Sequence, residues 1–326
     1  MSLEDIIGQE EITNTLKKSI VKQNVFHAYI FEGPDGMGKK KAAFNFAKAV
    51  LCIQPDGDSC GKCTACQKMD NNAHPDYIFI EPDGTSIKDV QIEDMQKNIS
   101  KKPIEGQNTV VVINKSDSMT VRAQNRLLKT LEEPNAHVII ILLTHNANML
   151  LPTIVSRCMI LKFKPVSDSV IKNYLKEKYN ISENDAGILT TFCNGRIELA
   201  EELYLSDDFK EIRQKSIDMA KKISIFKEED IWEMISIFEK QKENAIDFLD
   251  MIEYWYRDII ILHVSGNNHL IINIDCLNML IKETKKIGHE KAIKIVRIIE
   301  DTKKDLNMNL NFNFVVKNML LKIQEV

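Results

Sequence analysis

The chain reads Gly33-Pro34-Asp35-Gly36-Met37-Gly38-Lys39-Lys40 at the point around which its first half is organised. This stretch, the glycine loop, follows the apolar run 28–31 and precedes a helical pattern that begins at Lys41. A strand, a glycine loop and a helix in this order are typical of phosphate binding, because glycines let backbone N–H groups turn inward and the helix N-terminus adds partial positive charge. The stretch therefore predicts an α/β fold of the nucleotide-binding type.

The glycine loop matches only part of the phosphate-binding motif. Gly33, Gly38 and Lys39 satisfy the pattern G-x-x-x-x-G-K. The next position of the motif is Ser or Thr, whose hydroxyl binds Mg²⁺, but this chain has Lys40 there. An ammonium group has only hydrogen-bond donors and a positive charge, so it cannot bind a cation. We expect a phosphate-binding loop that has lost part of its chemistry.

The composition is that of an ordinary globular protein. The 326 residues suffice for two or three domains, with 44% apolar and 28% charged residues. A formal net charge of −4 argues against nucleic-acid binding over the whole surface, although it leaves room for a local basic patch. No apolar run reaches the ~18 residues of a membrane span, and the N-terminus lacks the pattern of a signal peptide. We expect a cytoplasmic protein with no membrane partner.

Four of the seven cysteines lie close together in the sequence. They are Cys52, Cys60, Cys63 and Cys66. Four thiolates can complete a tetrahedral Zn²⁺ shell, and without a secretory signal the cluster indicates metal binding rather than disulfides. A set of unrelated free thiols and an iron–sulfur cluster are the alternatives. Because four cysteines leave no open coordination position, we expect the zinc to be structural.

Apolar runs alternate with helical patterns through the first half of the chain. Beyond residues 28–31, the runs are 76–80, 109–113, 138–143 and 159–163. This alternation predicts βαβ units and a parallel sheet with helices on both faces. After residue 165 the strand pattern stops, and helical stripes such as Ile246, Leu249, Ile252, Trp255 and Ile259 are typical of a helical core. The expected domains are residues 1–165 with a cysteine module at 52–66, a small helical domain at 166–207, and an all-helical domain at 208–326.

The strand predicted at 109–113 does not end as a nucleotide-hydrolysing enzyme requires. Such enzymes place carboxylates there, which help to hold Mg²⁺ and polarise the attacking water. This chain has Asn114 and Lys115 instead. An amide is a weak metal ligand and a lysine repels a cation. Together with Lys40, these residues predict a chain that does not hydrolyse nucleotide; we expect no Mg²⁺ and leave ATP binding open.

Longer motifs resemble the clamp-loader branch of the AAA+ ATPases. In chain order they are residues 27–34, the four-cysteine module, residues 74–76, residues 125–134 (N-R-L-L-K-T-L-E-E-P) and residues 151–158 (L-P-T-I-V-S-R-C). The resemblance runs from about residue 6 to 164 and continues weakly to 307–311. Lys40, Asn114 and Lys115 replace residues that the active gamma/tau ATPases of this branch keep, so the chain resembles the delta-prime family of bacterial DNA polymerase III subunits. Glu198 also looks to stand where active relatives have a nucleotide-sensing arginine.

The resemblance implies a role in a five-membered ring whose ATP sites lie between neighbouring subunits. In that family the arginine of a Ser-Arg-Cys motif reaches into the site of the next subunit, and Ser156, Arg157 and Cys158 keep the motif here. The implied function is that of a non-hydrolysing subunit that donates Arg157 in trans, with residues 208–326 as an oligomerising collar, and helps to load a sliding clamp. The implied partners are gamma/tau ATPase subunits, a delta subunit, the sliding clamp and primer-template DNA.

Two other classes of function compete with this interpretation. One is an active AAA+ ATPase of the gamma/tau type, in which Lys39 suffices for nucleotide binding and Asp117 is recruited for the metal. The other is a zinc-knuckle module that binds nucleic acid and carries an inert nucleotide fold. Mg²⁺-dependent ATP turnover by the isolated chain would favour the first, and tight, salt-sensitive DNA binding without a protein partner would favour the second.

Overall fold

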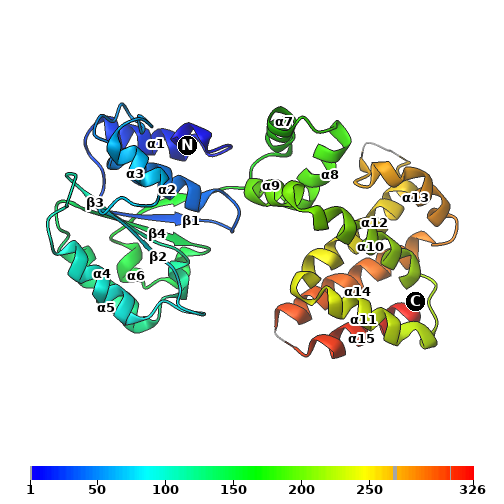
Figure 1. The fold of residues 1–326 in the computed structure, drawn as a ribbon. Coiled ribbons are helices and arrows are strands. Elements are labelled where there is room, and N and C mark those ends of the chain that lie inside the picture. Colours follow the sequence, from blue (N-terminus) through cyan, green and yellow to red (C-terminus); the bar gives the residue numbers. More distant parts are fainter. Residues whose placement is uncertain (1, 267–269, 309) are drawn as a thin grey trace. The chain divides into compact units, whose positions relative to one another are not determined.

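The apolar runs predicted as strands form one five-stranded parallel sheet (Figure 1). A computed structural model describes residues 2–266, 270–308 and 310–326. The strand order is β2-β3-β4-β1-β5. Strands β3 and β4 are buried along their whole length, as expected for a parallel sheet covered on both faces. The strands are β1 (Ala28–Glu32), β2 (Tyr77–Ile80), β3 (Thr109–Ile113), β4 (Val138–Thr144) and β5 (Met159–Lys162).

Helices cover both faces of the sheet, and this confirms the predicted fold class. Alternate residues of each strand point into two separate cores: Tyr29 and Phe31 join one core, and Ala28 and Ile30 join the other. The first core is closed by α1 (Glu10–Val21), α2 (Lys39–Val50) and α3 (Thr64–Asp70), and the second by α4 (Asp89–Ile99), α5 (Val121–Glu132) and α6 (Pro152–Val155). Short 3-10 turns lie at η1 (Leu3–Asp5), η2 (Ser116–Ser118) and η3 (Ala147–Met149).

The chain divides into two compact units. The first contains residues 1–173 and 193–199, and the second contains residues 174–192 and 200–326. The first unit thus extends past the sheet into the start of α7 (Asp168–Tyr179) and takes in the connection between α8 (Glu183–Cys193) and α9 (Ile197–Leu205). Among the described residues, no helix is both long and apolar enough to cross a membrane.

The second unit is helical and is built around α12 (Ala245–Val264). Leu249, Ile252, Trp255 and Ile259 are all fully buried, so the predicted core stripe is confirmed at these four positions, whereas Ile246 is only partly buried and lies outside this core. The hydroxyl of Tyr256 donates to the carbonyl oxygen of Ala220 at 2.6 Å, which fixes α12 against α10. The other helices after α9 are α10 (Asp207–Ile223), α11 (Ile231–Lys240), α13 (Leu277–Thr284), α14 (His289–Asn307) and α15 (Phe312–Gln324), with 3-10 turns η4 (Glu228–Asp230), η5 (Lys242–Asn244) and η7 (Ile274–Cys276).

One buried carboxylate anchors the loop that leads into β3. Asp76, just before β2, is 2% exposed and accepts backbone N–H groups from Ile104 (2.6 Å), Glu105 (2.9 Å) and Gly106 (3.1 Å). The backbone N–H of Asp76 in turn donates to Nδ1 of His74 at 3.2 Å. The motif at residues 74–76 therefore has a structural role, because it joins the start of β2 to the loop that leads into the neighbouring strand, β3.

Replacing Asp76 by Ala should lower the free energy of unfolding by about 2–4 kcal/mol, because three backbone N–H groups lose a charged, buried acceptor. Urea denaturation followed by circular dichroism measures the loss. Asp83→Ala is the control: its carboxylate is exposed and, among the described residues, pairs only with Lys88 at 2.7 Å, so we expect no measurable loss. Equal losses in the two variants would contradict the anchoring role of Asp76.

Candidate functional site

The glycine loop connects β1 to α2 as predicted, and its glycines are required by the backbone. Gly36 and Gly38 have φ of 79° and 84°, in the left-handed region that favours glycine. Gly33 has φ of 153°, and a Cβ there would lie 2.7 Å from the carbonyl oxygen of Phe163, which follows β5. The loop is therefore held by close packing of its backbone against the first unit.

Lys39 is turned back onto the glycine loop. Its side chain is almost fully buried, and Nζ donates to the carbonyl oxygens of Gly33 and Pro34, the latter at 2.8 Å. Nζ also lies 3.3 Å from a carboxylate oxygen of Asp35. The lysine that contacts phosphate oxygens in an active loop thus has its donors satisfied by the loop itself.

Lys40 and Asn114 meet at one carboxylate, that of Glu81. Nζ of Lys40 lies 3.1 Å from Oε1 of Glu81 and 4.7 Å from the ring centre of Phe79. Nδ2 of Asn114 donates to the same Oε1 at 3.2 Å. Glu81 directly follows β2, Asn114 directly follows β3, and Lys40 lies in the first turn of α2, which comes after β1. The carboxyl ends of parallel strands lie at the same edge of the sheet, so the topology brings these residues together. The hydrogen bonds from Lys40 and then Asn114 hold the pKa of Glu81 below its ordinary value.

The other residues singled out in the sequence lie after β3 and beside the glycine loop. Lys115 has a left-handed backbone, with φ of 49°, and precedes the turn η2, which contains Asp117. The backbone N–H of Glu198 donates to the carbonyl oxygen of Gly36 at 3.1 Å, so the start of α9 lies against the glycine loop. A Cβ on Gly36 would be 3.2 Å from Cβ of Arg196. Sequence reasoning identified Lys40 and Asn114 but missed Glu81, whose only signal is its place directly after an apolar strand.

Arg157 lies on the edge of the first unit with Ser156 and Cys158. Its side chain is about one-third exposed, with Nη2 3.0 Å from Oε1 of Glu132. Nη1 donates to the carbonyl oxygen of Thr153 at 3.0 Å and approaches Oγ of Ser156 at 3.4 Å. Burial raises the pKa of the Cys158 thiol to about 12, so this cysteine is an inert packing residue.

The structure brings the four predicted cysteine ligands together. Their sulfur atoms all lie within 4.8 Å of one another, and the pairs Cys52–Cys63 and Cys60–Cys66 are both 3.9 Å apart. Four sulfurs bound to zinc at ~2.3 Å stand about 3.8 Å apart in a tetrahedron, so the residues present fit this ion. Backbone N–H groups of Lys62 and Cys63 lower the pKa of Cys60 to about 6, whereas burial raises the pKa of Cys66.

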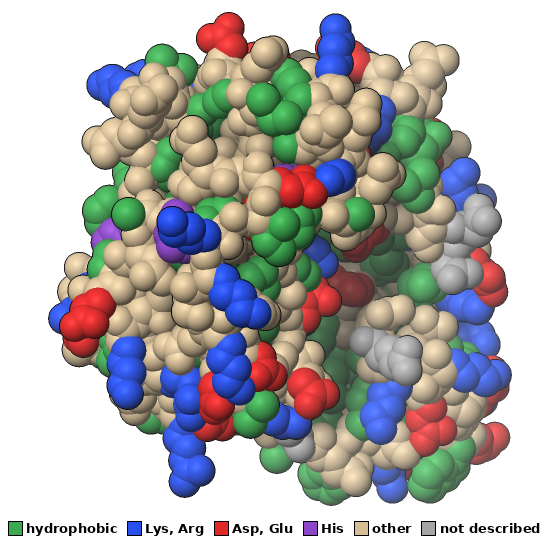
Figure 2. All heavy atoms as spheres, turned by 60° about the vertical axis from the view of Figure 1, so that its left-hand side comes forward, with side chains coloured by type: hydrophobic (Ala, Val, Ile, Leu, Met, Phe, Trp, Pro, Cys, Tyr) green, Lys and Arg blue, Asp and Glu red, His purple; other side chains and the backbone are tan. Residues whose placement is uncertain are grey.

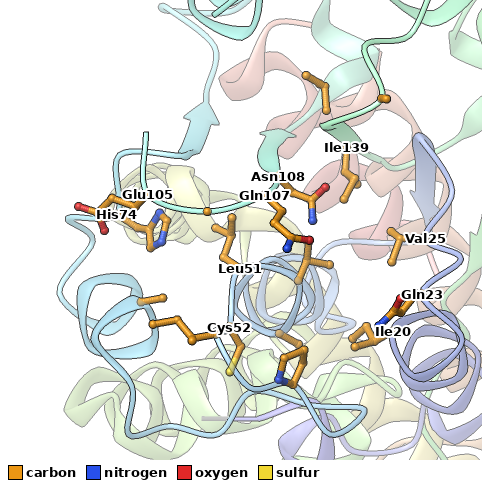
Figure 3. A pocket seen from close by; sticks show the side chains of 18 of the residues that line it. Ile20, Gln23, Val25, Leu51, Cys52, His74, Glu105, Gln107, Asn108 and Ile139 are labelled. Atoms are coloured by element: carbon orange, nitrogen blue, oxygen red, sulfur yellow. The ribbon is translucent and has the colours of Figure 1, made fainter. Parts of the chain in front are cut away.

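A cavity of about 890 Å³ lies beside the cysteine module and not at the glycine loop (Figure 3). Its wall includes Leu51, Cys52, Asn108 and Ile139, which lie near the amino ends of the strands. The glycine loop is at the opposite, carboxyl ends. On the face shown in Figure 2, Lys and Arg side chains alternate with Asp and Glu side chains rather than forming one basic surface. Neither feature adds a nucleotide-binding residue to the glycine loop.

Comparison with known proteins matches both ends of the chain to one group of proteins. The family described as "DNA polymerase III, delta subunit" matches residues 8–167, and the family described as "DNA polymerase III, delta subunit, C terminal" matches residues 207–325. The delta' subunit of DNA polymerase III from Bacillus subtilis is 32% identical over 97% of this chain and 96% of its own length. The tau subunit from the same organism is 34% identical over 59% of this chain and 35% of its own length.

Solved structures agree with the fold. A DNA polymerase III gamma subunit-related protein from Thermotoga maritima superposes with a TM-score of 0.51, at 17% identity, over 96% of this chain and 98% of that one. At this identity the likeness concerns the fold alone. The sequence match to the Bacillus subtilis delta' subunit extends through both units. The chain therefore belongs to the delta-prime family of clamp-loader subunits of DNA polymerase III.

Proposed function

We propose that this protein is a clamp-loader subunit that does not hydrolyse ATP and that donates Arg157 to the ATP site of a neighbouring subunit. One observation carries the first half of the proposal: Lys40 and Asn114 are both engaged by Glu81. Metal-assisted phosphoryl transfer needs a hydroxyl and a carboxylate that hold Mg²⁺ between the phosphates. Here the corresponding residues are an ammonium and an amide, and the nearby carboxylate is already paired with the ammonium.

The register of the sheet supports the second half, a role of Arg157 in trans. Arg157 precedes β5, whose first residue, Met159, pairs with Tyr29 near the start of β1. The glycine loop follows Glu32, the last residue of β1. Glu32 lies three residues beyond Tyr29, or about 10 Å further along the strand. Arg157 therefore stands at the opposite end of the sheet from its own glycine loop. An exposed guanidinium there suits the site of another subunit, where its planar, permanent charge would stabilise a transferring phosphoryl group.

The other parts of the proposal concern the whole assembly. Residues 1–165 would form the nucleotide-fold domain, 166–207 the lid and 208–326 the collar that holds the ring together. The partners would be gamma/tau ATPase subunits, a delta subunit, the sliding clamp and primer-template DNA, in the cytoplasm. Zinc bound by the four cysteines would fix the segment between α2 and α3, with no free position for catalysis.

The isolated wild-type chain should show no Mg²⁺-dependent ATP turnover. The double variant Lys40→Thr, Asn114→Asp removes the ammonium and supplies the missing hydroxyl and carboxylate. Because a like charge near a metal costs on the order of 1–4 kcal/mol, we expect it to bind ATP at least about tenfold more tightly with Mg²⁺ than without. Isothermal titration calorimetry measures both affinities, with Lys41→Thr as the matched control. ATP turnover by the wild-type chain alone would contradict the proposal and favour an active ATPase.

Arg157→Ala should leave assembly of the loader intact but remove ATP turnover at the site that this subunit contacts. The clean test uses a reconstituted loader whose other Ser-Arg-Cys arginines are replaced by Ala, so that only one site keeps its arginine. We expect turnover to fall about 10³-fold, the low end of the range for such residues, and Arg157→Lys to recover only a small part because it lacks the planar fork. Light scattering checks assembly, and unchanged turnover in an intact ring would refute the role in trans.

Metal analysis tests the zinc proposal. The purified chain should contain about one zinc ion, and Cys60→Ser with Cys63→Ser should abolish it and lower the thermal midpoint, because binding of a structural zinc ion contributes directly to folding. Cys276→Ser is the control for metal content alone, since that thiol lies outside the cluster but is buried in the helical core. Iron with a visible charge-transfer band would instead indicate an iron–sulfur cluster, and a wild-type chain free of metal would indicate unrelated thiols.

A further inference from the structure

We infer that Glu132 is a positioning residue: it fixes the direction in which Arg157 presents its guanidinium to the neighbouring site. This inference rests on the proposed role of Arg157 in trans. Its basis is the contact of 3.0 Å between Oε1 of Glu132 and Nη2 of Arg157, which joins the last residue of α5 to the segment after α6. A second contact on the other nitrogen, from Nη1 to the carbonyl oxygen of Thr153 at 3.0 Å, completes the clamp.

Both acceptors belong to rigid parts of the first unit. Helix α5 is anchored in the core by Leu127 and Leu131, which are almost fully buried. The same helix also holds the start of α6, because Oε1 of the buried Gln124 accepts the backbone N–H of Leu151 at 2.8 Å. Helix α5 therefore holds both the backbone before Arg157 and the carboxylate that contacts its guanidinium. A long, exposed arginine without such contacts would sample many rotamers, and its charge would be spread over many positions.

The clamp leaves donors free for a phosphate. A guanidinium has five N–H groups. Glu132 lies at ion-pair distance from Nη2, and Thr153 and Ser156 engage at most both N–H groups of Nη1. Among the described residues, the N–H of Nε and at least one N–H of Nη2 meet no further acceptor, so they are available to an acceptor from outside. Glu132 can therefore stay paired while Arg157 contacts a phosphate oxygen, so that the carboxylate orients the arginine without displacing its ligand.

The adjacent glutamate gives a matched control. Glu133 is also exposed and carries the same charge, but among the described residues its side chain has no hydrogen bond or ion pair. Glu132→Gln keeps the size of the side chain and weakens a charge-assisted contact to a neutral one. Exposed ion pairs of this kind shift an equilibrium by about 2- to 5-fold, which sets the size of the expected effect.

The test measures kcat and KM for ATP in the reconstituted loader that keeps only the arginine of this subunit. Glu132→Gln should lower kcat about 2- to 5-fold with KM unchanged, because the arginine acts in the transition state. Glu133→Gln should match the wild type. The double variant Glu132→Gln, Arg157→Ala should equal Arg157→Ala, because Glu132 has no effect without the arginine that it orients. Melting curves of the isolated chain check that each variant is folded.

The outcomes separate this inference from the proposed function. Loss of turnover in Arg157→Ala, together with a normal kcat in Glu132→Gln, would overturn the inference and leave the proposed function standing. A raised kcat in Glu132→Gln would mean that the carboxylate restrains the arginine, and a double variant worse than Arg157→Ala would mean that Glu132 has a separate structural role; either result overturns the inference. Full turnover in Arg157→Ala would refute the proposed function and the inference together.

Discussion

The carboxylate of Glu81 is the point on which the chemistry of the glycine loop depends. Lys40 and Asn114 reach it from two different parts of the sheet, and both contacts require the parallel order of β1, β3 and β2. An ammonium held 3.1 Å from a carboxylate already balances the charge that a bound cation would balance. The pair is half exposed, so it contributes little to the free energy of folding. Its consequence is chemical, because it places a positive charge where the motif calls for a metal-binding hydroxyl.

The glycine loop nevertheless has a use without nucleotide. Gly33 lets the backbone approach the carbonyl oxygen of Phe163, and the carbonyl oxygen of Gly36 accepts the backbone N–H of Glu198. The hydrogen bond to Gly36 ties residues 193–199 to the sheet-containing unit. A side chain at either glycine would meet neighbouring backbone or Arg196, so the loop needs its glycines for packing alone. The presence of a glycine-rich loop is therefore weak evidence of phosphate binding in this fold, and the residues around it decide the chemistry.

The sequence predicted local features better than contacts between distant segments. The strands and the cysteine ligands were predicted because apolar alternation and C-x-x-C spacing are local patterns. The order of the strands could not be read in this way, and neither could the partners of Lys40 and Arg157. Glu81 is separated from Lys40 by 41 residues, and Glu132 from Arg157 by 25, so only the folded sheet and the packing of α5 bring them together. The return of residues 193–199 to the first unit escaped prediction for the same reason.

Two carboxylates thus act on two cations with opposite consequences. Glu81 binds Lys40 at the carboxyl ends of the strands, where, in the proposed function, the ammonium would exclude the metal that catalysis needs. Glu132 binds Arg157 near the amino ends, where at least two N–H groups of the guanidinium meet no further acceptor among the described residues. The difference follows from the side chains. The ammonium of a lysine is a point charge, and here it is paired with one anion. A planar guanidinium can contact one anion along one edge and bind a second anion along another edge. In the proposed function, a fold without metal chemistry of its own would in this way still contribute a charge to a neighbouring site.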